Sequence, residues 1–355
     1  MLNNYRTSER ERSKTLLVVE GSHEKKLLFF SLLKAFPEIN IKRDNIWIYR
    51  TNIYMLYDQL IKEYSEPLEQ VDIDLPYVLS RNADNKPTQY KRDYTNIFLV
   101  FDYERHDPNF SEYKINRLLS LFDNVTDVGQ LYINYPMVES YMDFSCVPDA
   151  AFYQKKAWVI QRGNEYKNLV KDSPVLKLVE LEHRIENILK EKYPGVSNSK
   201  IHNCVDLLLN ESNSFSFDVI KEDIRSSVGD NDSLNQVSHL IADIIEKAFF
   251  YYNWGYVKNL RWMFTHIIFQ NLVKAEMIEN DTILSMSEAA EKGITDYNII
   301  ELTDLRNAFS SKSVLGVQNK SANHHMNPYI WVLNTSVFLV SDYKISLLDL
   351  TKANL

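Results

Sequence analysis

Residues 96–104 read NIFLVFDYE, an apolar run that ends in the acidic residues Asp102 and Glu104. A continuous run of this kind, without polar alternation, is typical of a strand buried on both faces of a parallel sheet. Residues 15–21, TLLVVEG, repeat the pattern, with Glu20 directly after the apolar residues. We therefore predict two buried parallel strands, each followed by carboxylates.

The flanking segments alternate between strand and helix patterns. Strands are expected at 15–19, 45–50, 96–101 and 129–135, and helices at 22–36, 53–64, 111–123 and after Pro136. This alternation predicts an α/β fold, a parallel sheet flanked by helices. Ligands of such sheets bind beyond the carboxyl ends of the strands, which is where the acidic residues are expected.

The pattern changes along the chain in two places. Residues 65–94 contain three prolines and many polar residues, which predicts an irregular insertion. After about residue 150 helical periodicity dominates, so residues 1–150 are interpreted as one domain and 151–355 as a mainly helical C-terminal domain. Within the second region, 234–278 predicts a long helix broken near Gly255, and 329–340 could form a strand.

Composition narrows the classes of function. The 355 residues are 45% hydrophobic with a net charge of -8, which is ordinary for a globular protein of two domains and argues against a basic DNA-coating protein. The two cysteines lie far apart, which fits a reducing cytoplasm, and no apolar stretch of membrane-spanning length occurs. We expect a cytoplasmic protein without a membrane partner. None of the 8 glycines lies in a GxxxxGK[ST] motif, so no P-loop ATP site is predicted.

The acidic residues suggest a metal site. Residues i and i+2 of an extended chain point the same way, so Asp102 and Glu104 are predicted to share one ion, with Glu20 as a third carboxylate. Hard oxygen ligands favour Mg²⁺, for which Mn²⁺ could substitute, and metal-assisted phosphodiester chemistry needs such ligands. Crowding of three carboxylates also raises at least one pKa unless a cation is present.

LLVVEG followed by a helix, and then FLVFDYE at the end of a later strand, resemble the Toprim domain of topoisomerases, primases and OLD-type nucleases. The resemblance covers roughly residues 15–145. It implies that Glu20 is a general acid or base or a metal ligand, and that Asp102 and Glu104 hold Mg²⁺. The family's second motif is usually Asp-x-Asp, so Glu104 departs from it, and its extra methylene moves the metal site.

The size of the chain, the lack of a P-loop and the arrangement DYE…PMVES resemble the Toprim effectors of bacterial phage defence, as in abortive-infection and PARIS systems. This resemblance implies a toxic endonuclease that cuts DNA or RNA, tRNA among them. It also implies an ABC-type or SMC-like ATPase as the partner that restrains the nuclease until infection.

Other acidic residues could extend the site, and each has a plainer interpretation. Glu24 could be a first-turn acid of a helix, Asp107 a turn former before proline, and Glu139 the start of a helix. His23 and His106 flank the acidic motifs as candidate proton shuttles or as ordinary structural residues. The sequence leaves open a non-catalytic binding or regulatory subunit of the same fold, and a homo-oligomer.

Overall fold

The computed structural model describes residues 14–65, 67–81, 88–160, 163–211, 215–229, 233–291 and 299–349. Its main sheet has five strands in the order β2-β1-β3-β5-β4, of which the first four are parallel and β4 pairs antiparallel with β5. The strands are β1 (Thr15–Val19), β2 (Ile46–Ile48), β3 (Asn96–Asp102), β4 (Asp123–Asn124) and β5 (Gly129–Asn134). The predicted α/β class is confirmed.

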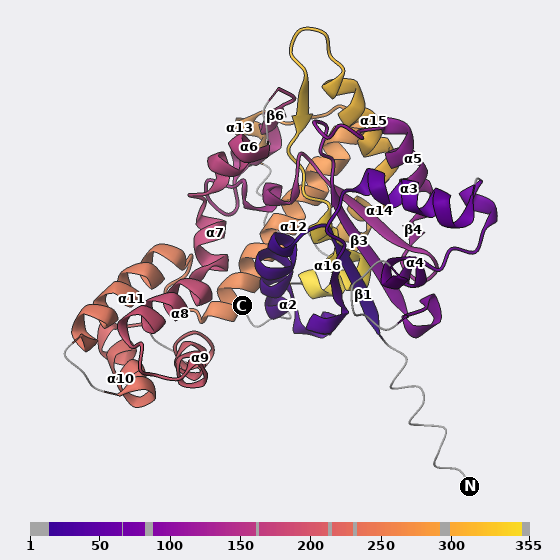
Figure 1. The fold of residues 1–355 in the computed structure, drawn as a ribbon. Helices are drawn as coiled ribbons and strands as arrows, with labels where there is room; N and C mark the ends of the chain where they lie inside the picture. The colour runs from indigo at the N-terminus through magenta and orange to yellow at the C-terminus, as the bar shows by residue number, and fades with distance from the viewer. Residues whose placement is uncertain are drawn as a thin grey trace.

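Helices cover both faces of this sheet, which explains the unbroken apolar runs of β1 and β3 (Figure 1). A π-helical turn, η1 (Glu24–Phe29), leads into α2 (Phe30–Ala35), which packs against the long helix α12 (Tyr256–Asn280). Helices α3 (Ile53–Tyr64) and α5 (Glu112–Leu121) pack against each other on the other side. The parallel pairing brings the carboxyl ends of β1, β3 and β5 to one edge.

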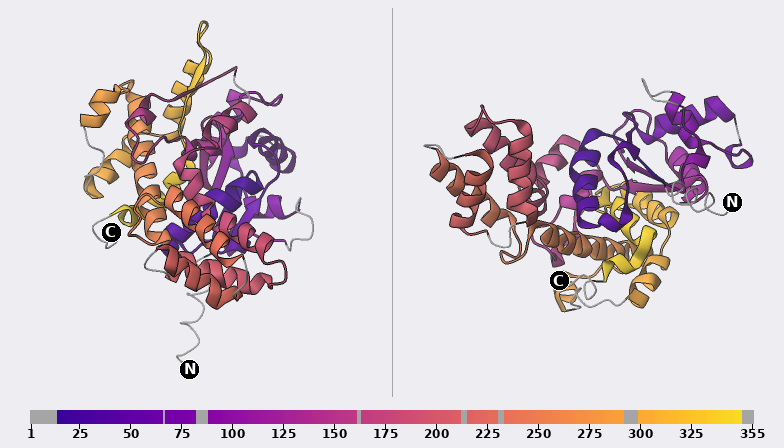
Figure 2. Two further views of the ribbon diagram at one scale, coloured as in Figure 1. Left: turned by 90° about the vertical axis from the view of Figure 1, so that its left-hand side faces the viewer. Right: turned by 90° about the horizontal axis from the view of Figure 1, so that it is seen from below.

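The middle of the chain forms a helical lobe beside the sheet (Figures 1 and 2). Helices α8 (Leu181–Lys192), α9 (Asn198–Asp206), α10 (Phe217–Val228) and α11 (Leu234–Ala248) pack together there. The short helix α7 (Pro174–Val179) contacts both α11 and α12, and so links the lobe to the rest. The predicted break near Gly255 is confirmed, because α11 ends at Ala248 and α12 begins after Gly255.

Helix α12 is buried around most of its circumference, and several of its polar residues are paired inside the protein. The Lys274 Nζ donates to the carbonyls of Phe152 at 2.8 Å and Lys155 at 2.9 Å. The Asn271 Oδ1 accepts from the Asn334 N–H at 2.7 Å. Among the described residues, neither α12 nor another helix has the length and apolar character of a membrane span.

The last part of the chain returns to the main sheet. Strand β7 (Tyr329–Trp331) pairs antiparallel with β6 (Lys156–Trp158), and Leu333 forms a bridge with Tyr135 just beyond β5. The strand expected over 329–340 is therefore shorter, because the Asn334 side chain binds the loop after β5 and the chain turns into η9 (Ser336–Phe338) and α16 (Leu339–Lys344). Residues from both predicted domains thus share one hydrophobic core.

The segment 65–94 contains more regular structure than the irregular insertion predicted for it. Helix α4 (Leu75–Arg81) buries Leu75, Val78 and Leu79, which have helical spacing. Pro76 lies in the first turn of α4, where proline is tolerated, so the presence of proline did not exclude a helix in this segment. Residues 66 and 82–87 of this segment lie outside the described residues.

The remaining elements are short connections and C-terminal helices. They are η2 (Pro37–Ile39), η3 (Arg43–Asn45), η4 (Leu68–Gln70), η5 (Lys91–Asp93), η6 (Val138–Met142), η7 (Ala150–Gln154), α6 (Gly163–Val170), η8 (Leu207–Glu211), α13 (Met286–Glu291), α14 (Ile299–Asn307), α15 (Ser311–Ala322) and η10 (Ile345–Leu348). Two of them, η6 and α6, matter for the site, because they approach the same edge of the sheet as the acidic strand ends.

Candidate acidic site at the sheet edge

Glu20 and Asp102 meet at the carboxyl edge of the sheet. Strands β1 and β3 pair in register with Val19 opposite Val100, so the residues that follow lie side by side. The backbone N–H of Asp102 donates to the Glu20 Oε2 at 3.2 Å. The Asp102 side chain is buried, and its Oδ1 accepts from the Asn134 Nδ2 at 3.4 Å. Two acids 82 positions apart are thus in direct contact.

Glu104 reaches the same edge by a different route from the one predicted. The chain does not stay extended after Asp102, because Glu104 has a left-handed backbone with φ 34° and begins a turn closed by the Asp107 N–H. Tyr103 is fully buried, and its carbonyl accepts from the Tyr54 hydroxyl at 2.6 Å. This anchor holds the turn, and the charge of Glu104 raises the pKa of both Glu20 and Asp102.

Glu24 folds back onto the start of the helix. A Cβ at Gly21 would come within 2.8 Å of the Glu24 Oε2, so the absence of a side chain at Gly21 leaves room for this carboxylate. Glu24 is only 6% exposed, and its Oε2 is buried without a hydrogen-bond partner in the described residues. A buried carboxylate oxygen without a donor is costly, which marks this position as one that suits a cation.

Glu139 lies in η6, directly after β5, and is the most buried acid of the site at 2% exposed. Its Oε1 lies 3.0 Å from the Lys167 Nζ and 3.6 Å from the His23 Nε2. Its Oε2 is buried without a hydrogen-bond partner among the described residues. Glu139 therefore has one oxygen neutralised by protein and a second one available to a ligand.

Asp107 serves the turn more than the site. Its Oδ2 accepts from the Asn52 Nδ2 at 2.6 Å, and its Oδ1 accepts from the Asn109 N–H at 2.6 Å. This is the pattern of a turn-forming aspartate. Its charge still acts on Glu20 and Glu104, because it raises the pKa of both.

We call the five acids Glu20, Glu24, Asp102, Glu104 and Glu139 the acidic edge. Burial raises the pKa of Glu20 to about 8, and the Glu104 carboxylate adds to this increase. Burial and then the charge of Glu20 raise the pKa of Asp102 well above its ordinary value. The pKa of Glu24 and of Glu104 is also raised, mainly by burial. The edge thus cannot hold all its negative charges at neutral pH without a cation.

The chemistry of these donors fits a hard divalent cation. The edge supplies carboxylate oxygens only, the ligand type that Mg²⁺ and Mn²⁺ prefer, and the buried oxygens of Glu24 and Glu139 still need partners. In the described part of the chain, no three acidic, histidine or cysteine side chains are already gathered around one point as a finished metal site. Binding would therefore need these side chains to rotate toward a common point.

Lys167, on α6, is a site residue that the sequence did not predict. Partial burial lowers its pKa, but the charges of Glu139, Asp102 and Glu24 raise it above its usual value, so the ammonium stays charged. It lies 28 positions after Glu139 on a helix outside the α/β repeats. No motif or spacing in the sequence marks this lysine, so only the fold reveals it.

The two histidines that flank the acidic motifs, and Ser140 beside Glu139, lie in different surroundings. His23 lies beside Glu139, as described above, whereas His106 lines a cavity next to Glu104. The Ser140 hydroxyl is fully buried and accepts from the Asn334 Nδ2 at 3.1 Å. Ser140 therefore holds η6 in place and is turned away from solvent.

Comparison of the chain with protein-family models, with curated proteins and with solved structures gave no match. The function must therefore be inferred from the chemistry of the acidic edge and from the surfaces around it.

Proposed function

We propose that this protein is a Mg²⁺-dependent endonuclease with a Toprim-type catalytic domain. The observation that carries the proposal is the convergence of Glu20, Asp102 and three further acids at one edge, with the pKa of Glu20 raised to about 8. Such a crowded, buried set of oxygen donors is stabilised by a divalent cation. A divalent cation at this edge would bind phosphate oxygens, so a nucleic acid is the substrate class that this site fits.

The roles of the residues follow from their positions. Asp102 and Glu104 would hold the cation, with Glu24 and the second oxygen of Glu139 as further donors. When bound, Mg²⁺ supplies Lewis-acid stabilisation of charge on the phosphate and lowers the pKa of water. Glu20 would move the proton of the attacking water, because a pKa near the working pH suits a general base or acid. Lys167 holds Glu139 in place and offers a positive charge beside the phosphate position.

Cleavage assays test the proposal directly. Plasmid DNA, total RNA and purified tRNA are incubated with the protein and Mg²⁺, with Mn²⁺, or with a chelator. Glu20→Gln and Asp102→Asn should abolish cleavage while leaving the circular dichroism spectrum unchanged. Glu63→Gln is the matched control, because Glu63 is an acid that pairs with Arg81 on the surface, away from the acidic edge. Full cleavage by Glu20→Gln would refute the proposal.

The biological role proposed with it is that of a toxic effector in phage defence, restrained by a partner ATPase. Its support is the resemblance of the acidic motifs together with the absence of a P-loop motif in the sequence. Expression of the wild-type protein alone should stop growth of the host, and expression of Glu20→Gln should not. An ATPase encoded beside it should co-purify and suppress the toxicity. Equal toxicity of both variants would contradict this role.

A non-catalytic binding subunit is the second candidate, and one observation favours it. The Lys167 ammonium already neutralises part of the edge at 3.0 Å from Glu139, so a protein cation could take the place of a metal. In this case the protein would bind nucleic acid or a partner without Mg²⁺ or Mn²⁺. Calorimetric titration separates the two functions, because the nuclease must bind Mn²⁺ and the binding subunit need not.

A further inference from the structure

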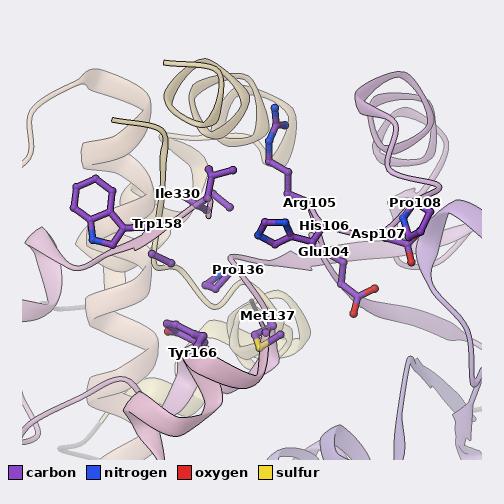
Figure 3. A pocket seen from close by; sticks show the side chains of 13 residues that line it. Glu104, Arg105, His106, Asp107, Pro108, Pro136, Met137, Trp158, Tyr166 and Ile330 are labelled. Atoms are coloured by element: carbon purple, nitrogen blue, oxygen red, sulfur yellow. The ribbon is translucent and has the colours of Figure 1, made fainter. Parts of the chain in front are cut away.

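A cavity of about 320 Å³ opens directly beside the acidic edge. Glu104 belongs to both, since it contributes to the acidic edge and also lines the cavity. The rest of the wall comes from segments that are far apart in the sequence and meet here (Figure 3). It includes His106 on the turn after β3, Pro136 and Met137 after β5, Tyr166 on α6, and Trp158 with Ile330 on the small sheet.

The walls of this cavity are mainly apolar. Trp158 is half exposed at 50%, although a tryptophan normally buries most of its large surface. Figure 3 shows its indole on one side of the cavity and the His106 ring on the other, with Pro136 and Tyr166 below. An exposed indole and an imidazole on opposite sides of one cavity suit a flat heteroaromatic ring that stacks between them.

We propose that this cavity, the Trp158 cavity, binds a single unpaired nucleobase of the nucleic acid cut at the acidic edge. The inference rests on the nuclease function proposed above and adds a substrate class to it, namely single-stranded or looped nucleic acid. Since Glu104 lies on the border, one nucleotide places its base in the cavity and its phosphate at the acids.

The size of the cavity selects an unpaired base. Small-molecule pockets span roughly 300–1,000 Å³, and this one lies at the small end of that range. A base that remains paired and stacked in a duplex cannot enter it, so a duplex must first give up a base at a cost in unstacking. Single strands and loops do not have this cost.

The test measures binding separately from cleavage. The probe is a single-stranded ten-nucleotide RNA with one 2-aminopurine, its DNA equivalent, and each strand annealed to its complement, with Ca²⁺ in place of Mg²⁺ to block cleavage. The wild-type protein should bind the single strands more tightly and quench the 2-aminopurine by stacking. Trp158→Ala should weaken single-strand binding about tenfold and abolish the quenching, whereas Trp158→Phe keeps most of both. Duplex binding should be the same for all three proteins.

Tyr113→Ala is the matched control, because Tyr113 is an aromatic residue 57% exposed on α5 that does not line the cavity. Equal affinity of Trp158→Ala and Tyr113→Ala for single strands, or tighter binding of duplex by the wild type, would overturn the proposal. Cleavage in Mg²⁺ reports on the nuclease function alone. If no variant cuts but the Trp158-dependent quenching persists, the cavity still binds a base and only the proposed chemistry fails.

Discussion

Adding Mg²⁺ to the metal-free protein at pH 7 should release protons from the acidic edge. Burial and then the Glu104 charge raise the pKa of Glu20 to about 8, so roughly 90% of this side chain is protonated at pH 7. A cation that binds the carboxylate displaces that proton, which gives about 0.9 protons per ion from Glu20 alone. The pKa of Asp102 is raised as well, so the total release should exceed the share of Glu20.

Isothermal titration calorimetry measures this release. Mg²⁺ or Mn²⁺ is titrated into the protein at pH 7 in PIPES, HEPES and Tris, and the slope of heat against buffer ionisation enthalpy gives the number of protons. At pH 9 only about 10% of Glu20 is still protonated, so its share of the release should fall about ninefold and the affinity should rise. Saturable binding at pH 7 without proton release would refute the reasoning, because the carboxylates would then be ionised before the ion arrives.

Three further predictions concern single residues. The pKa of Glu20 is raised to about 8 in the folded protein from 4.5, so its carboxyl stabilises the fold fully below pH 4.5 and loses this contribution as the pH rises through 8. In denaturant titrations without metal, Glu20→Gln should therefore be more stable than wild type at pH 9, by roughly 3 kcal/mol for this partly exposed group, and equal to it near pH 4.5. Equal stability of the two proteins at pH 9 would contradict the raised pKa. Gly21→Ala places a Cβ 2.8 Å from the Glu24 Oε2, so the Glu24 carboxylate must shift and Mn²⁺ affinity should fall about tenfold. The melting temperature should change little, because this oxygen is the far end of a flexible side chain, and Gly195→Ala, which meets no atom within 4 Å, is the control. Unchanged affinity in Gly21→Ala would show that Glu24 does not bind the cation. In Gly129→Ala the new Cβ would lie 2.8 Å from the Leu99 Cδ1 on a backbone with φ 122°, so the free energy of unfolding should fall by about 2–4 kcal/mol. Gly229 has φ 95° and no atom within 4 Å of a Cβ, so Gly229→Ala should lower it only by the cost of the strained backbone, about 1–2 kcal/mol. Equal losses in the two variants would show that the Leu99 side chain moves aside at no cost.

The sequence predicted the four parallel strands of the sheet, most clearly the two central ones, whose apolar runs are continuous and bounded by charge; it did not predict the two-residue β4. It also placed Glu20 near Asp102, since both follow parallel neighbouring strands, and the hydrogen bond between them fits that expectation. The backbone was expected to stay extended through Glu104, but this residue has a left-handed conformation, which residue type does not indicate when the residue is not glycine. That Glu104 shares an ion with Asp102 stays a prediction. Alternation alone cannot reveal where a strand stops being extended.

Contacts between distant segments were beyond sequence reasoning. Lys167 reaches Glu139 from a short helix outside the α/β repeats, and Trp158 faces the turn after β3 from the small sheet. The end of the chain looked like a strand because residues 329–340 are mostly apolar, yet the buried Asn334 binds Val138 and Ser140 and redirects it. Such hydrogen bonds depend on the folded arrangement and carry no local pattern.

The role of Glu20 and Asp102 as the centre of a divalent-cation site is most directly tested by anomalous diffraction from a crystal soaked in Mn²⁺. We predict a Mn²⁺ peak at the carboxyl edge of the sheet, within coordinating distance of Asp102 and of at least one of Glu20, Glu24, Glu104 and Glu139. An acidic edge without any such peak, in a crystal where Mn²⁺ binds elsewhere on the protein, would contradict the claim.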